Sequence, residues 1–412
     1  MISRAYQPHH ERQLAIWLFS CAFVIYGMIL LGGVTRLTES GLSMVEWRPI
    51  MGIWPPIGEA AWMEVFQKYQ QFPEYQVLNQ DMTLDGFKVI FMYEYLHRVL
   101  GRLIGLMFIL PLLWFCLRGV IRPGLMPRLL LLLVLGGCQG LLGWYMVKSG
   151  LVDRPSVSQY RLTAHLGLAV ALFAAIVWQA MSLWRHRSVS AAGSATAPSV
   201  ATATTAAASR SQKEDPRASR WALLIVGLVY MMVLSGGLVA GTDAGFFYPT
   251  WPLMGESFVP PGLYSADPGW LSAFEDAITI QFNHRMFAYF LCLVVGTFSL
   301  WLLFQRSRPG LRWFGALILF ALLLQVSLGI STLLTHVAVP VAAAHQGGAI
   351  FLLLSLLLTA HMLRYPASAV ATEAALASDN SPPNRLSRPA RLPRGLYGEG
   401  RPDSVPYRPR EA

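Results

Sequence analysis

The sequence predicts an all-α integral membrane protein in which eight transmembrane helices form two parallel-repeat four-helix bundles. Three observations support this fold class. The chain is 54% hydrophobic and only 13% charged, whereas a soluble domain is about 25% charged. It contains apolar stretches long enough to cross a bilayer. Four histidines recur within these stretches in two matched pairs.

Eight apolar stretches have about the 20 residues that a membrane-spanning helix needs. They lie at 14–34, 89–117, 127–148, 160–184, 221–241, 277–304, 311–334 and 341–363. Arginines are concentrated in the connections on one side, whereas 242–276 carries acidic residues and no Lys or Arg. The positive-inside rule therefore places both termini on the cytoplasmic or matrix side. The net charge of +10 follows from this topology, and no basic patch interleaved with aromatics suggests nucleic-acid binding.

Polar segments divide the chain into four parts. We expect an N-terminal bundle with a long outer loop at 35–88 in residues 1–187, a flexible cytoplasmic linker at 188–219, a C-terminal bundle at 220–365 and a disordered tail at 366–412. The linker and the tail have too little apolar content to form a core. Each half has four spans, an even number, so both halves enter the membrane from the same side. The repeat is therefore expected to be parallel, with a pseudo-twofold axis along the membrane normal.

Histidines occupy equivalent positions in the two halves. Tyr-Leu-His-Arg around His97 matches Phe-Asn-His-Arg around His284, and Ala-His-Leu-Gly around His165 matches Ala-His-Gln-Gly around His345. With about 1.5 Å of rise per residue, all four lie roughly 6–12 Å below the outer ends of their spans. Imidazole is costly in a lipid-embedded helix, which makes these histidines functional candidates. Two imidazoles at equal depth on two helices suit the axial ligation of haem. Zinc would need further ligands near each pair, and a hydrogen-bonded packing role is the other alternative.

The two halves differ in one ionisable residue. Glu94 precedes His97 by three positions and shares its helical face, whereas the equivalent residue before His284 is Gln281. A carboxylate at this depth is expensive, so the N-terminal half is the better candidate for chemistry. Glu94 is then expected to act as a proton acceptor or as an electrostatic stabiliser.

Two arginines also match across the repeat. Arg98 and Arg285 each follow a histidine, and a guanidinium group suits bidentate contact with a haem propionate. Other roles remain open: Arg98 could hold the outer loop above it, and Glu94 could form an ion pair with Arg98 or Arg102.

Several ordered motifs together resemble the haem A synthase family. They are Gly-Gly-Val-Thr-Arg-Leu-Thr-Glu-Ser-Gly-Leu-Ser (32–43), Glu-Tyr-Leu-His-Arg (94–98), Ala-His-Leu-Gly (164–167), Phe-Asn-His-Arg (282–285) and Ala-His-Gln-Gly (344–347). The resemblance covers essentially all of residues 14–363. Some members carry a cysteine pair in the first outer loop, and this chain has no cysteine between 35 and 88. It therefore resembles the type that lacks the pair.

The resemblance implies an eight-helix enzyme of a bacterial inner membrane that oxidises a methyl substituent of haem O to the formyl group of haem A through an alcohol. His284 and His345 would be the axial ligands of a resident haem b. His97 and His165 would hold the substrate haem, with Glu94 as the glutamate required for activity. A homo-oligomer is also implied, as are contacts with haem O synthase and with assembly proteins of the terminal oxidase that uses haem A.

Two other functions fit parts of the pattern. A di-haem electron carrier between a quinol and a periplasmic acceptor would use the four histidines but would not need Glu94. A parallel-repeat transporter is a weaker alternative, because transporter repeats usually break their helices at the midplane. No Gly or Pro interruption recurs there in both halves.

Overall fold

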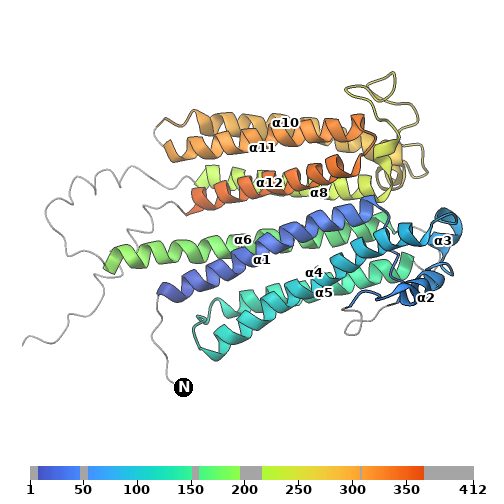
Figure 1. Cartoon of the computed structure of the whole chain (residues 1–412). Coiled ribbons are helices and arrows are strands. Elements are labelled where there is room, and N and C mark those ends of the chain that lie inside the picture. The colour runs from blue at the N-terminus through green and yellow to red at the C-terminus, as the bar shows by residue number, and fades with distance from the viewer. Residues whose placement is uncertain (1–7, 47–53, 151–156, 195–215, 307–308, 366–412) are drawn as a thin grey trace, which may run out of the picture.

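The computed structural model describes residues 8–46, 54–150, 157–194, 216–306 and 309–365. Within these ranges it is helical and has eight helices long and apolar enough to cross a membrane, which confirms the eight predicted spans. The helices run side by side (Figure 1). They are α1 (Pro8–Leu37), α4 (Leu84–Leu117), α5 (Met126–Gly150), α6 (Gln159–Ser194), α8 (Pro216–Gly241), α10 (Ala277–Leu303), α11 (Pro309–Leu334) and α12 (Val339–Arg364).

Several helix starts follow from local sequence signals. At the start of α4, Thr83 accepts a hydrogen bond from the Gly86 backbone N–H over 3.2 Å. Asp276 caps α10 in the same way, accepting from the Thr279 N–H over 2.8 Å. Such caps satisfy N–H groups that the helix itself leaves unpaired. Helix α4 begins five residues before the predicted apolar span at 89, because the cap lies in the polar segment that precedes the span.

Each half of the chain forms a closed group of four helices. In the N-terminal half, α1 contacts α4 and α6, and α5 contacts α4 and α6. In the C-terminal half, α8 contacts α10 and α12, and α11 contacts α10 and α12. The groups meet where α6 packs on α8 and α1 packs on α12, so these four helices lie at the centre (Figure 1). One apolar core runs through both groups.

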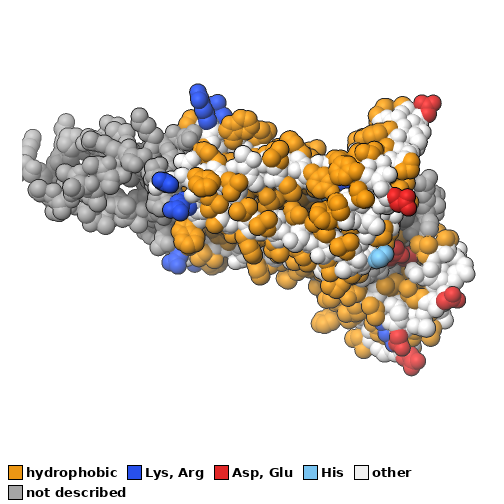
Figure 2. All heavy atoms as spheres, turned by 90° about the horizontal axis from the view of Figure 1, so that it is seen from above, with side chains coloured by type: hydrophobic (Ala, Val, Ile, Leu, Met, Phe, Trp, Pro, Cys, Tyr) orange, Lys and Arg blue, Asp and Glu red, His pale blue; other side chains and the backbone are white. Residues whose placement is uncertain are grey.

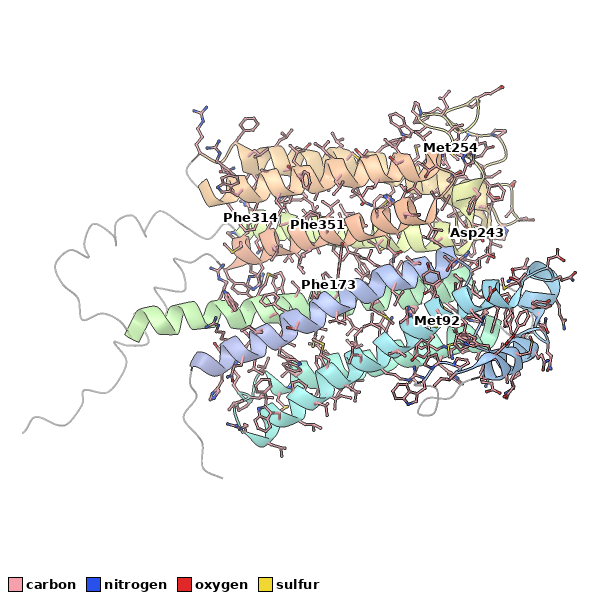
Figure 3. All side chains as sticks on the ribbon, in the orientation of Figure 1. Met92, Phe173, Asp243, Met254, Phe314 and Phe351 are labelled. Carbon is pink, nitrogen blue, oxygen red and sulfur yellow. The ribbon has the colours of Figure 1, made fainter. Side chains whose placement is uncertain are left out.

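Equivalent contacts recur on the two sides of this central junction. Tyr26 of α1 donates a hydrogen bond to the Gly347 carbonyl of α12 over 3.2 Å, and Tyr230 of α8 donates to the Gly167 carbonyl of α6 over the same distance. At the outer end, Arg36 of α1 pairs with Asp243 just beyond α8 at 2.9 Å (Figure 3). The two tyrosines occupy equivalent positions of the repeat predicted from the sequence, and each donates a hydrogen bond to a glycine carbonyl of the other bundle.

The described part of the outer loop 35–88 forms an ordered cap. It contains α2 (Glu59–Tyr69) and α3 (Pro73–Leu78), and α2 packs on α4. Phe66 and Tyr69 of α2 join Phe87 and Phe91 of α4 in a small aromatic core. The Tyr69 and Phe87 rings are stacked with centroids 5.0 Å apart. The connection from α8 to α10, with η2 (Ala244–Phe246), η3 (Gly269–Leu271) and α9 (Ser272–Glu275), lies at the same end of the molecule (Figure 1).

Charged residues are segregated along the helix axes. Figure 2 shows Lys and Arg side chains at the end opposite the cap, Asp and Glu side chains together with a few Lys or Arg atoms at the cap end, and a hydrophobic surface between them. Helix α6 continues to Ser194 and α8 begins at Pro216, so both described ends of the predicted linker 188–219 are helical. Residues 195–215 and the predicted tail 366–412 lie outside the described residues.

Candidate functional site

The N-terminal histidines lie on two different helices of their bundle. His97 belongs to α4 and His165 to α6, and the two are close enough to interact electrostatically. Each ring packs against a glycine of an adjacent helix. A Cβ on Gly32 of α1 would lie 3.0 Å from His97 Cε1, and one on Gly143 of α5 would lie 2.9 Å from His165 Cε1. Glycine is therefore needed at both positions to leave room for an imidazole.

The C-terminal histidines repeat this arrangement. His284 of α10 faces Gly236 of α8, and His345 of α12 faces Gly329 of α11. A Cβ would lie 3.6 Å from the His284 ring and 2.8 Å from the His345 ring. The two histidines are again close enough to interact electrostatically. The structure thus brings the four predicted histidines together as two pairs, one in each bundle.

The two pairs differ in what holds their Nδ1 atoms. Ser235 Oγ lies 3.0 Å from His284 Nδ1, and Gln325 Nε2 lies 3.2 Å from His345 Nδ1. In the N-terminal pair, the Nδ1 atoms of His97 and His165 are buried without a hydrogen-bond partner. A group that contacts a ring nitrogen orients the imidazole. Both C-terminal rings are contacted at Nδ1, whereas in the N-terminal pair Gln139 Nε2 lies 3.4 Å from His165 Nε2 and neither Nδ1 has a partner.

This donor set suits haem better than zinc. Each bundle supplies two imidazoles from different helices, which is the ligand set of a bis-histidine haem. A closed zinc site would need four ligands. The described residues contain no group of three or more His, Cys, Asp or Glu side chains that could hold a metal ion. Zinc thus lacks a ligand set in this part of the chain.

Glu94 is almost fully buried and surrounded by donors. It is 3% exposed, and its Oε2 accepts hydrogen bonds from Ser43 Oγ and from the Met44 backbone N–H, each at 2.7 Å. Its Oε1 forms an ion pair with Arg98. The ion pair that the sequence left open therefore exists, and the same carboxylate also anchors the segment leading into the cap.

Arg98 and Arg285, which match across the repeat, both donate hydrogen bonds to the backbone of an outer loop. Arg98 donates to the Met44 carbonyl at 2.9 Å and to the Glu46 carbonyl at 3.4 Å. Arg285 donates to the carbonyls of Tyr248 at 2.6 Å and Thr250 at 2.9 Å. The loop-holding role considered for Arg98 is thus present in both halves. Arg285 Nε is buried and has no hydrogen-bond partner.

Sequence reasoning did not find the residues that seat the histidines. Gly-Gly recurs at 32–33 and 236–237, and Gln139 matches Gln325, but such matches do not identify the side chains that these residues contact. Gln139 Nε2 donates to the His165 carbonyl at 3.0 Å and lies 3.4 Å from His165 Nε2, and Gln325 Nε2 lies 3.2 Å from His345 Nδ1. Ser235 gave no signal, because its equivalent in the repeat is Leu31.

Comparison with known proteins identifies the family of this chain. The family model described as COX15-CtaA, cytochrome oxidase assembly protein, matches residues 15–357. A protein of Nitrosospira multiformis named heme A synthase is 44% identical over 86% of this chain and 94% of its own length. Proteins of the same name from Paramagnetospirillum magneticum and Rhodospirillum centenum are 45% and 43% identical, each over 86% of this chain and over 94% and 89% of their own lengths. The chain belongs to the COX15-CtaA family of cytochrome oxidase assembly proteins.

Proposed function

We propose that this protein is a haem A synthase, a membrane-bound oxidoreductase that converts a methyl substituent of haem O to the formyl group of haem A through an alcohol. Haem O would be held by His97 and His165, and a resident haem b by His284 and His345. The observation that carries this proposal is the asymmetry of two otherwise matching histidine pairs, of which only one has a buried carboxylate beside it. The relatives named heme A synthase support the same activity.

The C-terminal pair is suited to keeping a cofactor in place. Ser235 Oγ can accept a hydrogen bond from Nδ1–H of His284, which leaves His284 Nε2 unprotonated and able to ligate iron, and Gln325 Nε2 contacts the His345 ring at Nδ1. When bound there, haem b supplies one-electron redox chemistry whose potential depends on the two imidazoles and on burial. Arg285 Nε would gain a partner if a propionate oxygen reached that edge of the guanidinium group. Arg98 is proposed to serve the corresponding propionate in the N-terminal bundle.

The N-terminal pair is suited to a molecule that enters and leaves. No described side chain holds Nδ1 of His97 or His165, and the contact to a ring nitrogen of the pair is the 3.4 Å approach of Gln139 Nε2 to His165 Nε2. The His97 ring can therefore adjust to an arriving porphyrin. Glu94 lies one helical turn before His97 and is fixed by Arg98, Ser43 and Met44. A fixed carboxylate next to the reacting substituent can accept a proton at Oε1 or Oε2 and can stabilise positive charge.

The charge segregation supports an orientation in a bacterial inner membrane with both termini in the cytoplasm. Arginine-rich ends of spanning helices remain on the cytoplasmic side. The cap and both histidine pairs then lie toward the periplasm. Homo-oligomerisation and contacts with haem O synthase and terminal oxidase assembly proteins belong to the same proposal, and the cytochrome oxidase assembly family supports them.

The proposal is tested by identifying the haems extracted from purified protein that was expressed with a supply of haem O. The wild type should yield haem b and haem A. Glu94→Gln should lower haem A formation roughly a hundredfold or more while the haem b spectrum persists, because it removes the proton acceptor and keeps the side-chain shape. Gln281→Leu, at the equivalent C-terminal position, should still form haem A.

Two outcomes would contradict this function. A wild-type protein that leaves haem O unchanged but passes electrons from a quinol to an acceptor would be a di-haem carrier. Loss of haem b in Glu94→Gln would give Glu94 a structural role in place of a catalytic one.

A further inference from the structure

The glycine pairs of α1 and α8 each face two bundles at once. Gly32 lies against His97 of its own bundle, whereas a Cβ on the next residue, Gly33, would overlap the side-chain amide of Gln346 from α12. Small residues at such positions let membrane helices approach closely. The first glycine of the pair thus contacts a histidine ring, and the second leaves room for a side chain from the other bundle.

The glycine pair of α8 makes the same two kinds of contact on the opposite side of the junction. Gly236 of α8 lies against His284 of its own bundle. A Cβ on Gly237 would lie 2.9 Å from Oγ1 of Thr163, which belongs to α6 of the other bundle. Each glycine pair therefore lies between a histidine of its own bundle and the helix that carries a histidine of the other pair.

The two junctions differ in polarity. Gln346 Nε2 donates a 2.9 Å hydrogen bond to the carbonyl of Ile29, which is buried in α1. At the other junction Thr163 Oγ1 is buried and has no hydrogen-bond partner. Gln346 also directly follows His345 in the chain. The side chain of Gln346, next to His345 on α12, is therefore hydrogen-bonded to the turn of α1 that contacts His97.

We propose that Gln346 is a positioning residue that couples the two histidine sites by fixing α1 against α12, so that Gly32 holds the His97 ring in place for the substrate haem. This inference rests on the proposed binding of a haem by each pair. The connection between α1 and α12 consists of the Gln346 hydrogen bond, the Tyr26–Gly347 hydrogen bond and the close helix contact at Gly33, which makes it a specific physical connection. The other junction has the matching Tyr230–Gly167 hydrogen bond, but Thr163 Oγ1 has no partner among the described residues, so only the α1–α12 junction adds a side-chain amide.

The test is electron paramagnetic resonance of the full-length ferric protein supplied with haem O, with haem O affinity measured by optical titration. The two low-spin signals are assigned by their loss in His97→Ala and in His345→Ala. Gln346→Met keeps the side-chain length but removes the amide. It should shift the g values of the N-terminal signal and weaken haem O binding about fivefold, as the loss of one buried hydrogen bond predicts. The C-terminal signal should shift less, because His345 keeps its own contacts with Gly329 and Gln325.

Two further variants separate coupling from simple packing. Gly33→Ala should give the same N-terminal shift, since a Cβ there would expel the Gln346 amide. Thr163→Val, an isosteric change at the matching junction, should leave both signals unchanged. An unaltered N-terminal signal in Gln346→Met, or a shift confined to the C-terminal signal, would overturn the coupling. Absence of a second haem signal in the wild type would overturn the proposed function and the coupling with it.

Discussion

The two bundles share a scaffold but prepare their histidines differently. In the C-terminal bundle, Ser235 and Gln325 lie within hydrogen-bonding distance of the two Nδ1 atoms. In the N-terminal bundle neither Nδ1 has a partner, and a buried carboxylate lies one turn from His97. A ring restrained by hydrogen bonds suits permanent ligation, whereas an unrestrained ring suits exchange. Under the proposed function, this difference would separate a bundle that keeps its haem from a bundle that acts on one.

Two pairs of equivalent residues account for much of this division. Ser235 corresponds to Leu31 and Glu94 to Gln281. The first pair determines whether a hydroxyl lies next to Nδ1 of the histidine that follows the outer loop. The second determines whether a carboxyl or an amide group lies one helical turn before that histidine. The remaining framework, including the seating glycines and the arginines that bind the outer loops, is common to both halves.

The largest expected effect comes from replacing the glycines that contact the histidine rings by alanine. A Cβ at Gly32 would crowd the His97 ring at 3.0 Å, whereas a Cβ at Gly236 would make ordinary contact with the His284 ring at 3.6 Å. Gly32→Ala should therefore lower haem A formation roughly a hundredfold, because small misplacements of a ligand are costly in catalysis. Gly236→Ala should retain haem b and activity within about twofold. Extracted haems and single-turnover rates measure both effects.

Gly329→Ala tests the same argument within the C-terminal bundle. There a Cβ would lie 2.8 Å from the His345 ring, so this variant should lose haem b while Gly236→Ala keeps it. Equal behaviour of the two variants would show that the glycines do not seat the histidines.

A smaller effect is expected from exchanging the residues behind the rings. Ser235→Ala removes the group next to His284 Nδ1 and should weaken haem b retention roughly tenfold, in line with the loss of an outer-shell partner. Leu31→Ser introduces a hydroxyl at the equivalent N-terminal position and should slow haem release from that bundle. Haem transfer to apomyoglobin measures both rates. If Leu31→Ser leaves release unchanged, the unpaired Nδ1 of His97 does not determine exchange.

Much of this fold could be predicted from the sequence because a bilayer imposes a simple length and polarity rule on each helix. The four histidines and Glu94 were visible because ionisable groups are rare in such helices. The partners of these residues were not visible. Ser235 and Gln346 are uncharged residues whose importance depends on a neighbouring helix, and only the three-dimensional arrangement identifies that neighbour. Glu74 of α3 is also buried, but the sequence did not indicate this, because a carboxylate is common in a polar loop.

The smallest expected effect concerns the cap, which gives the N-terminal bundle a second buried acid. Glu74 of α3 is 4% exposed, and its Oε2 has no hydrogen-bond partner. Burial raises the pKa of Glu74 from 4.5 to about 8, opposed by a hydrogen bond with Tyr69 of α2 and reinforced by the charges of Glu94 on α4 and Glu39 beyond α1. The described acidic residues of the C-terminal outer loop are not buried in this way.

The pKa of Glu74 is higher in the folded cap than in the unfolded chain, so a protonated Glu74 favours the folded cap. This stabilisation is complete below pH 4.5 and is lost as the pH rises toward about 8. The cap of the wild type should therefore open more readily at pH 8.5 than at pH 5, by roughly tenfold or more relative to Glu74→Gln at the same pH. Limited proteolysis within residues 59–78 measures the opening, and taking the ratio to Glu74→Gln removes the pH dependence of the protease. A ratio that does not change with pH would mean that Glu74 is ionised in the folded cap, and the cap would then not respond to pH through this residue.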